Sequence, residues 1–207
     1  MLNDTIINIG RQYGSGGRDI GIKLAEDLNV PYYDKELLKR AAKNSGLCEK
    51  LFESFDEKPK SLLYSLVVDP YSFNPNPTGY GLIEEDVYVA VFEAVRKIAD
   101  EGPCVIIGRC ADYALKDYKK CLNLFIYAPI EKRIERIANA ENISEEKAKE
   151  RIKKVDKQRA SYYNFYTNKK WGDVKSYDYC IDSSVLGIDG TADLIKYILE
   201  KKKLKAE

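Results

Sequence analysis

The sequence contains no histidine, and this absence removes several kinds of enzyme site at once. Catalytic triads that depend on histidine, histidine metal sites and histidine acid–base catalysis are all excluded. The five cysteines include no C-x-x-C pair, which argues against a zinc site, and their odd number fits a reducing compartment. Any chemistry must therefore use carboxylates, cations, hydroxyls, thiols or the backbone.

An excess of charge of one sign is also lacking. The 207 residues include 34 Lys and Arg against 33 Asp and Glu, so the formal net charge is only +1. No overall field favours binding to nucleic acid or to a membrane surface, and we expect neither as a partner. No apolar run is long enough to cross a bilayer, and the absence of a secretory signal leads us to expect a cytoplasmic protein. The length and the 44% hydrophobic content predict one domain with its own core.

The strongest local pattern is a glycine-rich stretch near the N-terminus. Residues 5–9 are a β-branched run that predicts a buried strand, and apolar residues at helical spacing predict a helix through Ile20 and Leu24. Four glycines lie between these two segments: Gly10, Gly14, Gly16 and Gly17. A strand, a glycine loop and a helix together bind phosphate through backbone N–H groups and the helix N-terminus. We therefore favour a phosphate-binding loop over an ordinary turn.

This loop does not match the standard phosphate-loop pattern, G-x-x-x-x-G-K-[ST]. With Gly16 as the second glycine, Arg11 stands where the first glycine would be, Gly17 replaces the lysine and Arg18 replaces the hydroxyl residue. A guanidinium pairs with phosphate oxygens in a bidentate manner. Arg18 is therefore our candidate for the electrostatic role of the missing lysine.

The rest of the chain alternates between strand and helix patterns, which predicts an α/β fold. Further strands are expected at residues 30–34, 104–108, 122–127 and 177–182, with helices between them. This alternation indicates a parallel sheet covered by helices on both faces. Residues 69–81 contain three prolines and two glycines, so we predict an irregular segment there, either a functional loop or a linker.

In open parallel sheets, ligands bind beyond the carboxyl ends of the strands. Charged residues follow several predicted strands: Asp34, Arg109, Asp112, Arg133 and Arg136. Acids and arginines at one edge suit phosphoryl transfer, where the protein positions the reactants and neutralises charge. Simpler roles stay open: Asp34 could cap the following helix, and Arg109 could pair with a structural acid. Arg133 and Arg136 could lie on a solvated helix face.

A helix that begins after Ser144 has an unusually charged and aromatic second half. Its charged residues Arg151, Asp156 and Arg159 are candidates for a site, but they could equally form surface ion pairs of little energetic value. Its tyrosines could serve packing alone.

Several stretches, taken in order, resemble the cytidylate kinase-like family of nucleoside-monophosphate-kinase-type proteins. They are residues 11–20 (RQYGSGGRDI), 32–38 (YYDKELL), 105–113 (VIIGRCADY), 128–137 (APIEKRIERI) and 179–184 (YCIDSS). The family's loop itself lacks the usual lysine. The resemblance implies a three-layer P-loop NTPase-type fold, in which helices flank a parallel sheet. A single domain, residues 1–207, would carry an acceptor-binding insert near residues 35–100 and a helical lid near residues 140–175.

The resemblance also implies roles for individual residues. The loop residues would bind the phosphates of ATP: Gly14, Ser15, Gly16, Gly17, Arg18 and Asp19. The acceptor would be bound by Asp34, Arg40, Arg109 and Asp112. Charged residues of the loop and lid would act on the transferring group: Arg18, Arg133, Arg151, Asp156 and Arg159. No residue is assigned as a metal ligand.

Two departures from the family pattern concern the chemistry and the substrate. True cytidylate kinases carry the loop lysine, where this chain has Gly17, and an acid directly after the arginine matched by Arg109, where this chain has Cys110. We therefore expect an ATP- and Mg²⁺-dependent phosphotransferase that acts on a small acceptor, with CMP or dCMP as the first candidates. A kinase for another small acceptor and a nucleotide-binding regulator without turnover are the alternatives.

Overall fold

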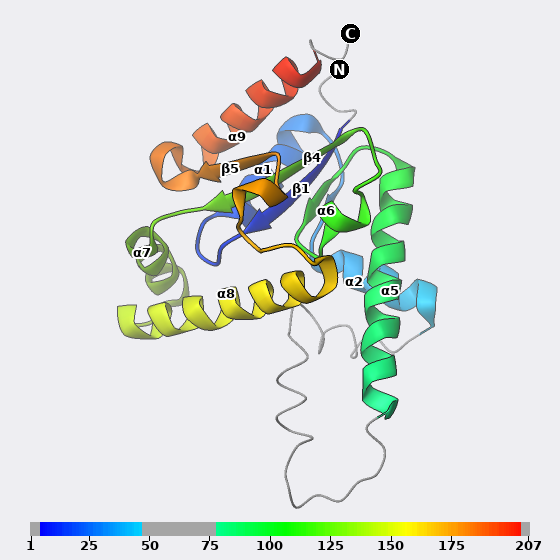
Figure 1. Cartoon of the computed structure of the whole chain (residues 1–207). Helices are drawn as coiled ribbons and strands as arrows, with labels where there is room; N and C mark the ends of the chain where they lie inside the picture. Colours follow the sequence, from blue (N-terminus) through cyan, green and yellow to red (C-terminus); the bar gives the residue numbers. More distant parts are fainter. Residues whose placement is uncertain (1–4, 47–77, 204–207) are drawn as a thin grey trace, which may run out of the picture.

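One parallel sheet forms the centre of the computed structural model, which describes residues 5–46 and 78–203. Its strands are β1 (Ile6–Arg11), β2 (Tyr32–Tyr33), β3 (Val105–Ile107), β4 (Cys121–Tyr127) and β5 (Tyr179–Asp182). The strand order is β2-β3-β1-β4-β5, and every pair of neighbours is parallel. The first strand therefore lies in the middle of the sheet, and its carboxyl end lies between those of β3 and β4 (Figure 1).

Helices cover both faces of this sheet. They are α1 (Gly17–Leu28), α2 (Lys35–Ser45), α5 (Thr78–Glu101), α6 (Ala111–Ala114), α7 (Ile130–Glu141), α8 (Glu145–Thr167) and α9 (Ser183–Lys203), with a 3-10 turn η1 (Val174–Ser176). Strand side chains alternate between the faces. Ile6 packs in a core with α2, α5 and α6, whereas Ile7 and Ile9 pack with α1 and α9. The predicted three-layer α/β fold is confirmed.

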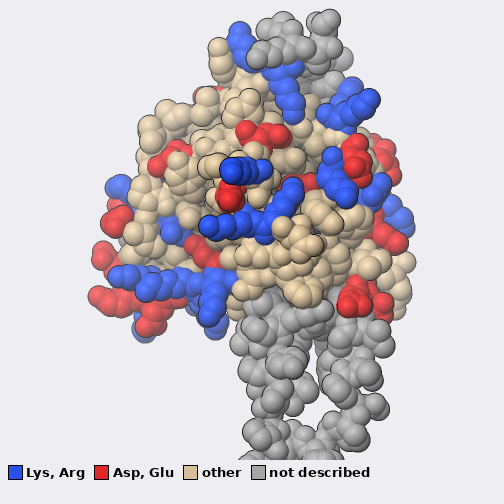
Figure 2. All heavy atoms as spheres, viewed as in Figure 1, with Lys and Arg blue, Asp and Glu red and all other residues tan. Residues whose placement is uncertain are grey.

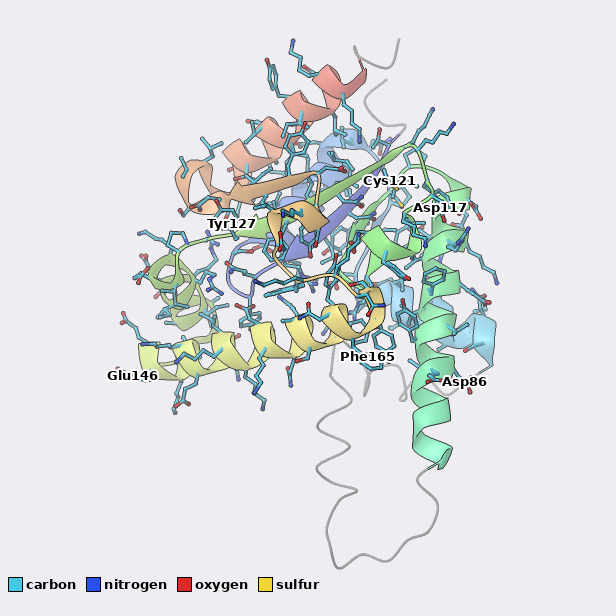
Figure 3. All side chains as sticks on the ribbon, viewed as in Figure 1. Asp86, Asp117, Cys121, Tyr127, Glu146 and Phe165 are labelled. Atoms are coloured by element: carbon cyan, nitrogen blue, oxygen red, sulfur yellow. The ribbon has the colours of Figure 1, made fainter. Side chains whose placement is uncertain are left out.

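The helices α7 and α8 lie outside these layers, near the carboxyl ends of the strands (Figure 1). Ser144 caps α8 as predicted, because its Oγ accepts a hydrogen bond from the backbone N–H of Lys147. Figure 3 shows α8 extending from Glu146 at its outer end to Phe165, close to α5. This course places the charged second half of α8 over the edge of the sheet where ligands bind in such folds.

Some boundaries differ from the sequence prediction. The prediction of an irregular segment at residues 69–81 is wrong for its last four residues, which form the first turn of α5, and residues 69–77 lie outside the described residues. Because Val87, Val91 and Val95 anchor α5 in the core, packing can extend the helix backwards through two unfavourable glycines. The strand expected at residues 30–34 is reduced to the two residues that pair with β3.

Candidate active site

The loop between β1 and α1 takes its shape from glycine. Gly14 and Gly16 have φ angles of 80° and 79°, in the left-handed region that side chains disfavour. A Cβ atom on Gly14 would also lie 3.0 Å from the carbonyl oxygen of Arg133. Helix α1 begins after Gly16 without a side-chain cap. Helix N-termini without a side-chain cap can bind an anion, and phosphate binding by this loop stays a prediction.

Two side chains hold the loop from outside through its carbonyl groups. Arg136 Nη1 donates to the carbonyl oxygen of Gly14 at 2.7 Å, and Ser183 Oγ donates to that of Ser15 at 2.5 Å. These two hydrogen bonds fix the carbonyl groups of the loop against α7 and α9. The alternative that Arg136 merely lies on a solvated helix face is therefore wrong.

Asp156 of α8 joins the lid to the loop. Its Oδ1 accepts from the backbone N–H of Tyr13 at 2.7 Å, and its Oδ2 accepts from Arg133 Nη1 at 2.6 Å. Arg133 is only 8% exposed, so its solvated-face alternative is also wrong. Farther along α8, Arg159 Nη1 donates to the carbonyl oxygen of Arg11 at 3.2 Å. Two of the predicted lid residues, Asp156 and Arg159, therefore contact the loop or its immediate neighbours, and Arg133 on the preceding helix joins them.

Asp34 lies between the loop helix and the end of β3. It stands at the N-cap position of α2, but its side chain makes no capping hydrogen bond. Instead, Oδ2 accepts from Arg18 Nε at 3.0 Å, and Oδ1 lies 3.8 Å from Arg109 Nη2. The hydrogen bond to Asp34 raises the pKa of Arg18. Asp34 therefore does not cap α2 through its side chain, and it instead bridges Arg18 and Arg109.

The backbone at the end of β3 is strained. Gly108, Arg109 and Cys110 all have positive φ angles, of 69°, 61° and 54°. A non-glycine residue in this region costs on the order of 1–3 kcal/mol, and such strain gathers at functional sites. The turn buries Arg109, where desolvation first and the charge of Arg11 second lower the pKa of Arg109 to about 10. Arg109 is thus a cation at neutral pH, in a place where an anion would be stabilised.

Asp112 connects the same edge of the sheet to α8. Its Oδ2 accepts from Tyr163 Oη at 2.7 Å and lies 3.7 Å from Lys169 Nζ. Burial raises the pKa of Asp112. Tyr163 and Tyr162 are both buried in an aromatic cluster beside Cys110, which agrees with packing, the alternative left open for these tyrosines. For Tyr163, the hydrogen bond to Asp112 adds a second role.

Two predicted site residues lie apart from this group. Arg40 pairs with Glu101 at 2.8 Å and stacks over the ring of Tyr33, at the contact between α2 and α5. Arg151 pairs with Glu141, which also accepts a hydrogen bond from the phenol of Tyr13. Their contacts within the described residues do not bring either side chain to Asp34, and their predicted roles stay predictions.

Sequence reasoning named Arg136 only as one of the charged residues at the sheet edge, and it gave no specific role to three others that shape the site: Arg11, Tyr13 and Ser183. Tyr13 and Ser183 act through the loop backbone, for which no residue pattern gives a signal. Arg136 lies on a helix whose spacing equally fits solvent exposure. Arg11 carried one usable signal, because it stands at a glycine position of the standard loop pattern.

Two cavities adjoin the loop. An open pocket of about 630 Å³ lies between α7 and the start of α9, and Arg136 and Ser183, which hold the loop carbonyls, are part of its lining. This volume is in the range of small-molecule sites. A small cavity of about 30 Å³ is lined by Arg11, Arg109 and Arg159 together with Asp112 and aromatic residues. The open pocket therefore borders the residues that hold the loop carbonyls, and the small cavity borders the end of β1.

The surface around the lid has no single sign of charge. Figure 2 shows Lys and Arg side chains mixed with Asp and Glu over the α7–α8 end of the molecule. In the described part of the chain, no helix has the length and hydropathy needed to cross a membrane.

Comparison with known proteins identifies the family. The cytidylate kinase-like family profile matches residues 6–185. A cytidylate kinase from Methanocaldococcus jannaschii is 27% identical over 202 residues, which cover 96% of this chain and 99% of that protein. The crystal structure of an uncharacterized protein from Eubacterium ventriosum is 30% identical, with a TM-score of 0.69 over 95% of this chain and 98% of the other. Shikimate kinase from Acinetobacter baumannii, in complex with shikimate, is 14% identical and shares the fold, with a TM-score of 0.52 over 97% and 95% of the two chains. The chain belongs to the cytidylate kinase-like family and is a phosphotransferase of this kind, built on the fold of the P-loop kinases.

Proposed function

We propose that this enzyme transfers the γ-phosphoryl group of ATP to a nucleoside monophosphate, with CMP or dCMP as the preferred acceptor. The observation that supports this most directly is the position of Asp34 between Arg18 and Arg109. One carboxylate thereby links the helix of the phosphate loop to the arginine expected to bind the acceptor phosphate. The relatives named cytidylate kinases favour cytidine nucleotides among the possible acceptors.

The loop fits a nucleotide triphosphate as donor. Gly14 lets the loop pack closely against Arg133 of α7, and the uncapped first turn of α1 would offer N–H groups to phosphate oxygens. The nucleoside would lie in the pocket between α7 and α9, which continues from the loop through Arg136 and Ser183. Mg²⁺ in kinases is bound by one or two carboxylates together with phosphate oxygens. Asp19, in the first turn of α1, is the carboxylate that follows the loop most closely in the sequence, and it is our candidate to hold Mg²⁺.

The chain's own residues would act by position and charge. Arg109 would bind the acceptor phosphate, and Asp34 would fix the guanidinium groups of Arg109 and Arg18 relative to each other. An acceptor phosphate is already an adequate nucleophile, so a chain without histidine lacks nothing that this reaction requires. Arg133, Asp156 and Arg159 would hold α8 over the loop and exclude water.

A coupled assay of ADP release tests this function. The purified protein would be given ATP and Mg²⁺ with CMP, dCMP, UMP, AMP or a non-nucleotide alcohol. We expect CMP or dCMP to give the highest kcat/KM. Binding of ATP without ADP release for any acceptor would contradict the proposal and favour a regulator without turnover.

One observation favours a second candidate, a kinase for a different small acceptor. The acid next to the acceptor arginine is replaced by Cys110, and the nearby Asp112 carboxylate is already bound by Tyr163 and Lys169. An acid committed in this way is less available to read the edge of a cytosine ring. The same acceptor panel separates the two candidates, because a non-nucleotide acceptor would then give the highest kcat/KM.

A further inference from the structure

The two departures of the loop from the standard pattern are in contact with each other. Arg11 stands where the pattern has its first glycine, and Gly17 stands where it has lysine. A Cβ atom on Gly17 would lie 2.7 Å from the Cβ of Arg11, closer than two such atoms can approach. With Arg11 in place, no side chain fits at position 17 unless the backbone shifts. The glycine and the cation of the standard pattern have therefore exchanged positions.

The side chain of Arg11 lies toward the reaction edge of the sheet. Arg11 is 8% exposed and lines the small cavity of about 30 Å³ together with Arg109 and Arg159. Burial lowers the pKa of Arg109, and the charge of Arg11 is close enough to lower it further. Arg11, the residue that ends β1 before the phosphate loop, therefore shares a cavity with Arg109, the arginine predicted to bind the acceptor.

Arg18, our candidate from the sequence for the missing lysine, has a different place. Its side chain is 60% exposed, and its Nε donates to Asp34. A cation that is exposed and already bound to a carboxylate neutralises phosphate less effectively than a buried one. This contrast shifts the role of the missing lysine from Arg18 to Arg11.

We propose that Arg11 binds the γ-phosphate of the nucleotide donor and supplies, from the last residue of β1, the positive charge that standard loops carry at the position of Gly17. The inference rests on the proposed function only in taking a nucleoside triphosphate as the donor. A γ-phosphate between Arg11 and Arg109 offsets the repulsion of the two buried cations, and a guanidinium can bind two of its oxygens. Gly17 is then needed because it leaves room for the stem of Arg11.

Nucleotide binding without turnover tests this directly. The affinities of wild type, Arg11→Met and Arg11→Lys for the non-hydrolysable analogue AMP-PNP and for ADP would be measured by calorimetry with Mg²⁺. ADP serves as the reference, since AMP could enter the acceptor site. Arg96→Met is the matched control, because Arg96 is an exposed arginine on α5 that stacks on Phe92.

We expect Arg11→Met to weaken AMP-PNP binding by about 10-fold or more and ADP binding by less than about 3-fold, with partial recovery in Arg11→Lys. Arg96→Met should change neither. Equal losses of affinity for AMP-PNP and ADP would indicate a structural role for Arg11 and would overturn the proposal. Equal affinities of the wild-type protein for the two nucleotides would also overturn it. A change only in acceptor KM would also overturn it. These binding outcomes do not depend on the acceptor assay. In that assay, the proposed function fails if ADP is formed from ATP with none of the acceptors.

The exchange of positions has its own test in a double-mutant cycle. Gly17→Ala is expected to destabilise the wild type more than it destabilises Arg11→Gly, because the clash with the Arg11 stem is then absent. Urea unfolding of the four proteins measures this coupling. Additive losses would show that Gly17 does not serve to accommodate Arg11, and would remove the spatial part of the proposal.

Discussion

Two turns at the centre of the sheet differ in the residues that adopt their left-handed backbone conformations. The turn after β1 and the turn after β3 both reverse the chain from a buried strand into a helix. The first uses Gly14 and Gly16 for its left-handed backbone, whereas the second places Arg109 and Cys110 there. The first thus has little backbone strain and opens N–H groups to a ligand, and the second bears strain and buries a cation.

The difference indicates how each half of the reaction is supported. The glycine turn has no side chains to fix its shape, so Arg136 and Ser183 hold it from neighbouring helices through its carbonyl groups. The strained turn is fixed by its own packing and by Asp34 opposite Arg109. We infer that the donor loop depends on α7 and α9 for its geometry, whereas the acceptor arginine depends on the core.

Among the variants that test this difference between the two turns, removal of the buried cation Arg109 should have the largest effect. Arg109→Ala is expected to lower kcat/KM for the acceptor by about 100-fold or more, because a buried charge-assisted contact to phosphate is lost. The affinity for ATP should change by less than about 5-fold. Steady-state kinetics with varied acceptor, together with calorimetry for ATP, would measure both. Equal loss of both functions in a folded protein would contradict the assignment of Arg109 to the acceptor.

A side chain in the glycine turn should have the next largest effect. Gly14→Ala is expected to cost about 2 kcal/mol or more of unfolding free energy and to weaken ATP binding, because positive φ and a contact with Arg133 both oppose a Cβ. Gly46→Ala is the matched control, since Gly46 has a φ of 72° and open space around it. Urea unfolding and ATP titration of both variants would separate backbone strain from crowding. Equal losses in the two variants would show that the loop is not tightly packed.

The sequence predicted much of this architecture because its signals are local. Apolar runs and turn residues were sufficient for the parallel sheet, and glycines between a strand and a helix were sufficient for the phosphate loop. The strand-end rule also brought Asp34, Arg109 and Asp112 to one edge. These predictions needed only the order and chemical type of residues.

The remainder depends on distances between segments far apart in the chain. Nothing in the sequence shows that Asp156 accepts a hydrogen bond from the N–H of Tyr13, 143 residues away. The positive φ angle of Arg109 is likewise invisible, because arginine shows no preference for that backbone region. The contact between Arg11 and Gly17 could be suspected from the failed loop pattern, but only coordinates show that the two residues compete for one space.

A smaller effect, on the pH dependence of stability, is expected at Asp112, next to the strained turn. Burial raises the pKa of Asp112, so the folded protein holds this proton more tightly than the unfolded chain does. Its contribution to stability therefore falls as pH rises from the unfolded pKa toward the folded one. Asp112→Asn removes this titration, and its stability relative to wild type should increase as pH rises through that window. Urea unfolding of both proteins from pH 4 to 7 measures it, and parallel pH profiles would contradict it.

The smallest effect is expected outside both turns, at Arg40. Its partner Glu101 is exposed, and an exposed ion pair contributes about 0.2–1 kcal/mol, so Arg40→Gln should lower the unfolding free energy by no more than this. Because Glu101 and the ring of Tyr33 hold its guanidinium, we expect the acceptor KM to stay within about 2-fold of wild type. The acceptor KM of Arg40→Gln would be compared with that of Glu101→Gln. This second variant is the control, because it removes the other partner of the same ion pair. A several-fold rise in acceptor KM in Arg40→Gln alone would instead support the acceptor role that the family resemblance implies, and would extend the acceptor site from the strained turn onto α2.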